Sequence, residues 1–534
     1  MTTTASVEPA ASQAKAVAAI DIGANGIRMV IAQVFPDGRF EQLEQLQRAV
    51  RLGQDTFRRG RLSAESLRAA VAILRDYRKM LDLYNVKLTR TVATSAVREA
   101  VNADAFLDRV LMATGLEVSI IETSEESRLT VSAVRSGLDL PLGIERSDAL
   151  IAEVGGGSTL LTILHHGEIA ASQSLRLGSI RLQEMLATTY EPPARSAELL
   201  RHQIANVVSV IQSSLPLKKI RVFIAVGGDA RFAAGLVGKP TAGGQLHLVP
   251  RAEFDKLVER CTVHTTEELA KRYGLSFSEA ETLNPALLVY QALLHATRAR
   301  ELVISHVSMR DGLVMDLANQ VAGKEDAAQS EAVLQSATAI AEKYRVDFNH
   351  ARNVAHLAVQ LFDKLQAEHG LRPRHRLLLR VAGLLHEVGG FVSSRAHHKH
   401  SYYLLANSEI FGLTREEILI VALAARYHRR SSPKPAHLEY MALPRETRMV
   451  VSKLAALLRV ADALDRGHAQ QVSEIHCERR EDELFINVPG VSDLTLERRA
   501  LAVKADLFEE IYGLKIHVEE EQPAPRAAPT GPIR

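Results

Sequence analysis

The sequence predicts a duplicated α/β structure that is followed by a helical domain and a small α+β unit. Three observations lead to this prediction. A pattern of strand, glycine turn and strand occurs at residues 18–38 and again at residues 149–167. Helical and strand patterns alternate around both copies, which is typical of α/β folds. From about Lys324 one helix follows another. At roughly 150 residues per domain, a chain of 534 residues has room for three or four domains.

The internal repeat predicts a cleft between two similar halves. In the first copy, Asp21 precedes a glycine-rich turn. In the second copy, Glu153 takes the place of Asp21, and Gly155 to Ser158 form the turn. If the two turns face each other, each presents backbone N–H groups and one carboxylate. That arrangement suits phosphate oxygens together with a divalent cation.

The elements between the two copies also alternate. Ser63 to Leu83 has helical periodicity, and Val86 to Thr94 has the pattern of a strand. Val118 to Ile121 predicts another short strand. Residues 123–126, Thr-Ser-Glu-Glu, have the spacing of a capping box at the head of an apolar helix.

After the second copy, the sequence predicts a long helix and a further strand. The helix covers Ala197 to Leu215, and the strand covers Phe223 to Gly228 and ends in a glycine pair. Helices are expected from there through Ala318. The small last unit is predicted as strand, strand, helix and strand at residues 472–477, 484–488, 496–508 and 515–518.

The predicted domain boundaries follow from these changes in pattern. The first residues are small and polar, and the last are acidic and then rich in Pro and Ala, so both ends are expected to be disordered. The expected organisation is a leader at 1–15, α/β domains at 16–135 and 136–323, a helical domain at 324–470, an α+β unit at 471–518 and a tail at 519–534.

Composition excludes several classes of protein. The chain has 65 Lys and Arg against 63 Asp and Glu, so a polyanion must be bound by local basic patches. Two cysteines, Cys261 and Cys477, exclude a disulfide framework and a cysteine zinc site, and a cytoplasmic location is expected. No stretch approaches the roughly 20 apolar residues that cross a bilayer. Aromatic residues make up 5% of the chain, too few for base stacking, and sequence-specific nucleic-acid binding is not expected.

Seven stretches together resemble the exopolyphosphatase and guanosine pentaphosphate phosphohydrolase family in order and spacing. They are AIDIGANGIRMVIA, TVATSAVREA, IIETSEESRL, AEVGGGSTLL, LRLGSIRL, AVGGDARFAAG and SMRDGLVMD, within residues 17–318. The resemblance implies a duplicated actin-like (ribonuclease H-like) fold, which agrees with the internal repeat. It also implies hydrolysis of terminal phosphoanhydride bonds of polyphosphate or pppGpp with Mg²⁺.

The predicted active-site residues combine this resemblance with the chemistry of phosphoryl transfer. That reaction needs charge neutralisation, a bound cation and a group that orients water. The resemblance implies that Glu126 is the base, and the alternative is that Glu126 only caps a helix. Arg98 offers a guanidinium fork for phosphate. Asp21 and Glu153 are expected near the metal, with Glu153 also catalytic. Phosphate contacts are expected at Gly23, Asn25, Gly155, Gly156, Gly157, Ser158, Gly227 and Gly228.

The sequence departs from the family pattern at both turns. Ala24 and Gly26 replace two hydroxyl residues, so phosphate contact there is expected to be mainly through the main chain. Glu153 is one methylene longer than the usual Asp, and Leu160 replaces a second acid. Leu160 can hold neither metal nor water. Turnover is therefore expected to be weak, altered or absent, and the alternative function is a regulatory protein that binds polyphosphate or ppGpp.

A second group of residues resembles the HD phosphohydrolase pattern, as in the HD-like domain attached to long exopolyphosphatases. It implies a further metal, Mn²⁺ or Mg²⁺ among the candidates, with His398 and His400 as additional ligands or phosphate contacts. The alternatives are structural histidines, or an HD-centred nucleotide phosphohydrolase. The domain is also expected to extend a polyphosphate groove or a homodimer interface. The predicted metal ligands are His350, His386, Glu387, His428 and Asp462.

Basic clusters occur at residues 218–221, 372–380 and 426–434. They are expected either to line a path for a long polyanion or to be ordinary solvated helix surfaces.

Overall fold

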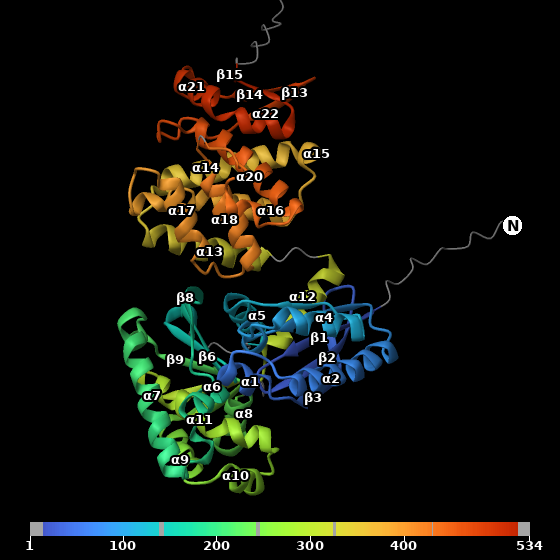
Figure 1. Ribbon diagram of the computed structural model, residues 1–534. Coiled ribbons are helices and arrows are strands. Elements are labelled where there is room, and N and C mark those ends of the chain that lie inside the picture. Colours follow the sequence, from blue (N-terminus) through green and yellow to red (C-terminus); the bar gives the residue numbers. More distant parts are fainter. Residues whose placement is uncertain (1–13, 138–143, 242–245, 324–326, 430, 522–534) are drawn as a thin grey trace, which may run out of the picture. The chain divides into compact units, whose positions relative to one another are not determined.

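The computed structural model describes residues 14–137, 144–241, 246–323, 327–429 and 431–521 (Figure 1). The chain divides into two compact units, residues 1–332 and residues 333–534. The predicted disordered leader and tail lie largely outside the described residues, but strand β1 already begins at Lys15 and strand β15 continues to Glu520. Within the described residues, no helix is long and apolar enough to cross a membrane.

The first sheet contains the first copy of the repeat. Its strand order is β3-β2-β1-β4-β5, with β1, β2 and β3 antiparallel and β4 and β5 parallel to β1. Both faces of β1 are buried, because Ile20 and Ile22 belong to one core cluster and Val17 and Ala19 to another. This explains the continuous apolar run in the sequence. The strands are β1 Lys15–Ile22, β2 Gly26–Val34, β3 Phe40–Ala49, β4 Leu88–Ala93 and β5 Val118–Ile120.

Helices cover both faces of this sheet (Figure 1). One face packs on α2 and α4, whose buried side chains share a cluster with Ile20. The other face packs on α5 and α12. Helix α12 lies within the range predicted for the second domain, but it packs against the first sheet. The helices are α1 Leu52–Arg59, α2 Ala64–Leu83, α3 Ser95–Arg98, α4 Ala103–Thr114, α5 Thr123–Ser136 and α12 Met309–Ala322.

The second sheet repeats the arrangement of the first. Strands β6, β7 and β8 are antiparallel, and β9 runs parallel to β6, as β4 does to β1. The predicted duplication of an α/β unit is therefore confirmed. The strand order is β10-β11-β12-β9-β6-β7-β8. The strands are β6 Ala149–Val154, β7 Thr159–His165, β8 Glu168–Leu175, β9 Val222–Val226, β10 Lys239–Pro240, β11 Leu246–Pro250 and β12 Glu301–Ser305.

The expectation of helices alone between residue 228 and Ala318 is wrong, because β11 and β12 lie in this region. Both strands are short, and β12 joins the sheet by pairing with β9, which is distant in the sequence. The helices of this half enclose a large apolar core. They are α6 Ser179–Leu186, α7 Pro193–Ser214, α8 Gly228–Val237, α9 Arg251–Thr262, α10 Thr266–Tyr273 and α11 Phe277–Ala296.

The second unit is helical, with a small sheet that shares its core. Side chains of the helices and of β14 and β15 belong to one apolar cluster. The first strand of this sheet was expected at residues 472–477, but β13 covers His476–Arg480, and the expected helix is two helices, α21 and α22. The helices are α13 Ala327–Lys343, α14 Phe348–Lys364, α15 Gln366–His369, α16 Pro373–Leu385, α17 His397–Ala406, α18 Arg415–Arg426, α19 Leu438–Met441, α20 Arg445–Leu464, α21 Thr495–Lys504 and α22 Asp506–Tyr512. The remaining strands are β14 Glu483–Val488 and β15 Lys515–Glu520.

Candidate active site

The two glycine turns of the repeat meet in the first unit. Gly23 N–H donates to the Gly26 carbonyl at 3.0 Å, and Gly155 N–H donates to the Ser158 carbonyl at 2.9 Å, so the turns are closed in the same way. A Cβ atom placed on Gly156 would lie 2.9 Å from the Cβ of Ala24. The turns therefore pack directly against each other, as the repeat predicts, and a side chain at Gly156 would push them apart.

A cavity of about 350 Å³ opens at the two turns. All the glycine-turn residues predicted to contact phosphate line it, and so do Asp21, Glu126 and Glu153. Within the described part of the chain, the N–H groups of Gly156, Gly157 and Ser158 donate to no protein acceptor. Free N–H groups at a glycine turn form an anion-binding concavity.

Helix α8 adds a second set of backbone donors. It begins at Gly228, directly after β9, and both glycines of the pair line the cavity. Gly227 has φ of +129°, a conformation that favours glycine and turns the chain from strand into helix. The first N–H groups of a helix have no partner within the helix, so the N-terminus of α8 also favours an anion.

Glu126 is buried in the first turn of α5 and ion-paired with Arg98. The Arg98 Nη1 atom donates to Glu126 Oε1 at 2.7 Å, and Arg98 also donates to the Ile121 carbonyl. Burial raises the pKa of Glu126 to about 7, against the opposing charge of Arg98, and Glu153 and Asp21 raise it further. The expected capping box at residues 123–126 does not form, because Glu122 is the N-cap residue and its side chain makes no capping bond. Glu126 is therefore free of a capping role.

Asp21 and Glu153 occupy equivalent places at the ends of β1 and β6. Asp21 Oδ2 lies 3.5 Å from Arg28 Nη1 and 3.4 Å from Arg310 Nη1. Glu153 Oε2 accepts a hydrogen bond of 2.6 Å from Thr130 Oγ1. Burial raises the pKa of Glu153, and the charge of Asp21 adds to this effect. A buried carboxylate and a half-buried one that repel each other are a donor set that fits Mg²⁺, which takes carboxylate oxygens.

Sequence reasoning missed five charged residues of this cavity, namely Arg28, Asp229, Arg231, Glu279 and Arg310. The Nε atom of Arg310 is buried without a hydrogen-bond partner, so it is available to an anion. Burial raises the pKa of Asp229 to about 6, although Thr282 donates to it at 3.1 Å. The sequence held a usable signal for four of these five residues. Asp229, Arg231 and Arg310 lie within the stretches AVGGDARFAAG and SMRDGLVMD, and Arg28 lies beside the first turn.

Leu160 is the register partner of Glu153 across β6 and β7, and it is buried. It therefore places an apolar side chain beside the Glu153 carboxylate, where the family pattern has an acid.

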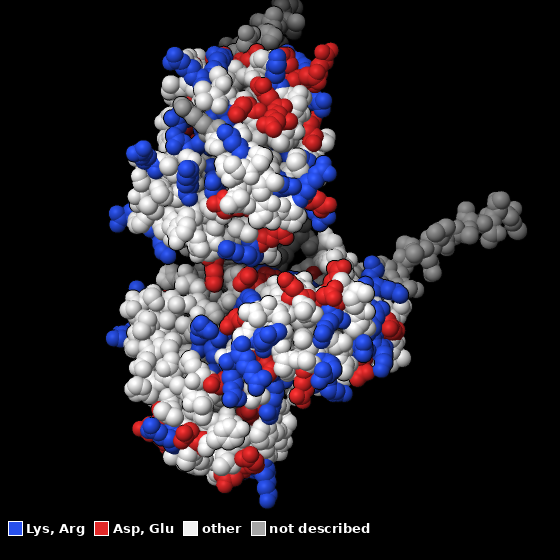
Figure 2. Space-filling model, viewed as in Figure 1, with Lys and Arg blue, Asp and Glu red and all other residues white. Residues whose placement is uncertain are grey.

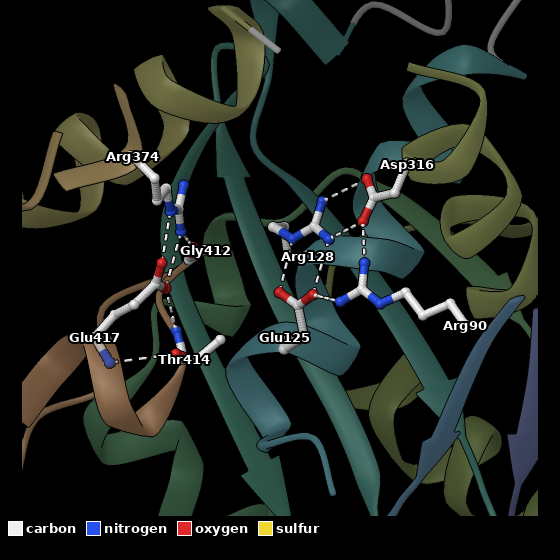
Figure 3. Close-up of polar contacts among 8 residues, drawn as sticks. All are labelled: Arg90, Glu125, Arg128, Asp316, Arg374, Gly412, Thr414 and Glu417. Carbon is white, nitrogen blue, oxygen red and sulfur yellow. Dashed lines mark hydrogen bonds and ion pairs between the residues drawn. The ribbon is translucent and has the colours of Figure 1, made fainter. Parts of the chain in front are cut away.

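Glu125, the neighbour of Glu126, is held by two arginines on another side of α5. Glu125 accepts hydrogen bonds from Arg128 and Arg90, and both arginines also bind Asp316 of α12 (Figure 3). Burial opposes ionisation of Glu125, but these two arginines lower its pKa to about 2. The first turn of α5 is thus held by a charged network on the side facing α12, while Glu126 faces the cavity.

Basic side chains gather on one face of the first unit. Figure 2 shows Lys and Arg side chains over the region where Figure 1 places α1. Arg51, Arg58 and Arg59 at this helix are exposed. Such a local patch favours anions even though the net charge of the chain is only +2.

In the second unit, the structure gathers three of the predicted metal ligands. Ligand atoms of His350, His386 and Asp462 lie within 4.8 Å of one another. Glu387 lies in a second group, with His350 and His468, and His468 was missed by sequence reasoning. His398 and His400 belong to neither group.

The hydrogen bonds of the histidines suit metal binding. The Nδ1–H of His350 donates to Asp465 at 2.9 Å, and that of His386 donates to the Gly383 carbonyl at 2.7 Å. Their Nε2 atoms are buried without hydrogen-bond partners, and His350 Nε2 lies 3.6 Å from Asp462 Oδ1. A histidine whose Nδ1–H is held in this way offers its Nε2 lone pair to a metal. His428 differs, because its Nε2 lies 3.1 Å from His397 Nε2. Lys504 of α21 forms a hydrogen bond with Asp462, so an ammonium competes for this carboxylate.

Two of the basic residues predicted to line a polyanion path, Arg374 and Arg376, form ion pairs within the protein. Arg374 donates to Glu417 at 2.6 Å and to the Gly412 carbonyl at 2.6 Å (Figure 3). Arg376 is bound to Asp363 at 2.7 Å. Arg430 lies outside the described residues. Arg374 in particular acts as a link between α16 and the start of α18.

Several known proteins are similar to this chain. Exopolyphosphatase 2 of Mycobacterium tuberculosis is 28% identical over 318 residues, which are 57% of this chain and 98% of that protein. Guanosine-5'-triphosphate,3'-diphosphate pyrophosphatase of Photobacterium profundum is 23% identical over 459 residues, which are 85% of this chain and 88% of that protein. A crystal structure of an exopolyphosphatase from Cytophaga hutchinsonii is similar, with a TM-score of 0.52 and 20% identity, over 58% of this chain and 99% of that chain.

The family match covers both units. Residues 30–321 match the Ppx/GppA phosphatase family, and residues 334–510 match domain III of the Ppx/GppA phosphatases. The first of these matches alone spans more than half of the 534 residues. The chain belongs to the Ppx/GppA phosphatase family.

Proposed function

We propose that the chain hydrolyses terminal phosphoanhydride bonds of inorganic polyphosphate and of pppGpp in the cavity of the first unit. The observation that carries the proposal is Glu126, a buried carboxyl with a pKa of about 7. It lines the same cavity as the glycine turns and as Arg28, Arg231 and Arg310. A base works best when its pKa lies near the working pH. The names of the relatives, exopolyphosphatase and guanosine-5'-triphosphate,3'-diphosphate pyrophosphatase, support both substrates.

In this proposal, backbone and guanidinium groups hold the terminal phosphate. The N–H groups of Gly156, Gly157 and Ser158 and the start of α8 bind its oxygens, and the unpartnered Nε of Arg310 binds a further oxygen. Asp21 and Glu153 are the residues that would hold Mg²⁺, which when bound neutralises charge on phosphate oxygens. These donors are fixed before substrate binds, so little reorganisation is needed as charge moves in the transition state.

Glu126 then activates the attacking water. Its carboxylate accepts a proton from the water, whose oxygen forms a bond to the terminal phosphorus, while the bridging P–O bond breaks. The shortened phosphate chain leaves with the bridging oxygen. Arg98 keeps Glu126 Oε1 in place at 2.7 Å, which leaves the other carboxyl oxygen for the water.

Phosphate release from polyphosphate and from pppGpp, measured with Mg²⁺, tests this proposal. Glu126→Gln keeps the shape of the side chain but removes its basic oxygen, so turnover should fall by about 10²-fold or more. Glu117→Gln changes an exposed carboxylate outside this cavity and serves as the matched control. Wild-type turnover in Glu126→Gln would contradict the assignment of the base.

Leu160 favours a second candidate function, a regulatory protein that binds polyphosphate or ppGpp without turning it over. Its buried side chain supplies no oxygen beside Glu153. Binding without phosphate release by the wild-type protein would identify this function.

The histidine cluster favours a third candidate, a nucleotide phosphohydrolase centred on His350, His386 and Asp462. Its support is a buried group in which the Nε2 atoms of His350 and His386 make no hydrogen bond and a carboxylate lies close by. Nucleotide hydrolysis that survives Glu126→Gln but is lost in His386→Ala would assign the chemistry to this group.

A further inference from the structure

A second cavity, of about 380 Å³, lies in the first unit away from the candidate active site. Residues of α6, of the turn Thr188–Tyr190 and of helices α7, α10 and α11 line it. Helices α7 and α11 lie side by side (Figure 1). Ser278 and Thr282 of α11 line the active-site cavity, whereas Glu281 and Asn284 line the second one. The second cavity shares no lining residue with the first.

Four side chains of this cavity carry a buried oxygen without a hydrogen-bond partner. They are Gln183 Oε1, Thr188 Oγ1, Glu281 Oε2 and Asn284 Oδ1. Gln183 and Glu281 are 9% and 8% exposed, and Thr188 is 3% exposed. The Nε2 atom of Gln183 donates to the Glu281 carbonyl at 2.8 Å, which fixes this amide with Oε1 as the free atom. Buried oxygens without donors are costly, so the cavity suits a ligand that brings N–H groups.

The charge of the lining favours a cation. Glu191 and Glu267 are exposed at the cavity, and Glu281 is buried within it. No Lys or Arg of the described chain is among the lining residues. Arg51 Nη2 approaches Glu281 Oε2 to 3.3 Å without the alignment of a hydrogen bond, and the Arg51 side chain is 44% exposed. A cation therefore already lies beside Glu281, but the carboxyl oxygen still lacks a directed donor.

Size and apolar lining distinguish an organic cation from a metal ion. One water-sized ion needs a cavity volume of only about 15 Å³, far less than the volume of this cavity. Pro192, Leu200 and Pro285 add apolar surface to the lining. We propose that this cavity binds a linear aliphatic polyamine, with one ammonium group at Glu281, Thr188 and Asn284, methylene groups along the apolar lining, and a second ammonium group near Glu191 and Glu267.

Calorimetric titration of the full-length protein with spermidine, without phosphate substrates, tests the proposal. We expect saturable binding of one spermidine per chain. Glu281→Gln removes the charge of the buried carboxylate and should weaken binding about tenfold or more, and Thr188→Val should weaken it several-fold. Glu198→Gln changes an exposed carboxylate of α7 that does not line the cavity, and it should bind like the wild type. Unchanged thermal unfolding of each variant shows that it folds.

Three results would overturn the proposal. The first is the absence of saturable binding at millimolar spermidine, because the cavity would then hold water only. The second is equal affinity in Glu281→Gln and Glu198→Gln, which would place the polyamine elsewhere. The third is displacement of spermidine by KCl at millimolar concentration more readily than by putrescine, which would assign the oxygens to an inorganic cation.

Discussion

Arg98 holds Glu126 in the candidate active site through an ion pair of 2.7 Å, and this pairing opposes the effect of burial on the carboxyl group. The two side chains come from different elements, α3 and the first turn of α5. Burial and this opposing contact together place the pKa of Glu126 at about 7, and the first predictions depend on this balance.

The rate of hydrolysis should rise with pH through about 7. Burial raises the pKa of Glu126 to about 7, so the carboxylate that accepts a proton from water predominates only above this pH. The measurement is kcat from pH 5.5 to 8.5 at fixed ionic strength. In Glu126→Gln the rise should be absent, and a pH-independent wild-type rate would contradict the assignment.

Stability should depend on pH in the opposite direction. An acid whose pKa is raised on folding binds its proton more tightly in the folded state than in the unfolded state. The stabilisation that this proton gives is present at low pH and is lost as pH rises through about 7. Glu126→Gln should therefore raise Tm relative to wild type at pH 8 and change it little at pH 5. An equal change in Tm at both pH values would show that Glu126 is not the titrating group.

Removing the positive partner should shift the pH profile. Arg98→Met takes away the charge that favours the ionised form of Glu126, so the midpoint of the kcat profile should move to higher pH and the maximal rate should fall. Arg98→Lys keeps the charge and should leave the midpoint nearer to that of the wild type. The same midpoint in Arg98→Met and wild type would contradict the coupling.

The network behind Glu126 should be important for stability. Arg128 is 2% exposed and binds both Glu125 and Asp316. Arg128→Met leaves two carboxylates without this partner, and the free energy of unfolding should fall by about 3 kcal/mol or more. The exposed pair of Arg78 and Asp82 provides the comparison, because Arg78→Met should cost about 1 kcal/mol or less. Equal losses in urea unfolding would refute this difference.

Restoring the family acid with Leu160→Glu should make stability depend on Mg²⁺. The new carboxylate would lie beside Glu153 in a buried register position, so Tm should fall without metal and recover with Mg²⁺. Mg²⁺-dependent phosphate release should increase if the missing acid limits the reaction. Unchanged activity with a recovered Tm would show that other groups supply its role.

Metal binding in the second unit should respond to Lys504. Its ammonium is hydrogen-bonded to Asp462, so Lys504→Met should increase the affinity for Mn²⁺ by removing a competing cation. The double variant His386→Ala, Glu387→Ala should abolish binding, whereas His476→Ala, an exposed histidine, should not. Metal analysis of the purified protein and titration with Mn²⁺ measure these effects.

The sequence by itself determined the local parts of this structure. The repeated glycine turns, their acidic partners Asp21 and Glu153, and most strands and helices of the first unit follow from patterns only a few residues long. Such patterns are readable because backbone conformation at a turn and the periodicity of buried side chains are local properties.

Only the tertiary structure decided which distant residues meet. It brought Arg310 to Asp21 across 289 positions, packed α12 on the first sheet, paired β12 with β9, and placed Lys504 on Asp462. It also decided that Glu126 faces Arg98 instead of capping its helix. The physical reason is that the pKa of a charged side chain depends on its burial and on its partners. Both are set by contacts between elements, which no local pattern specifies.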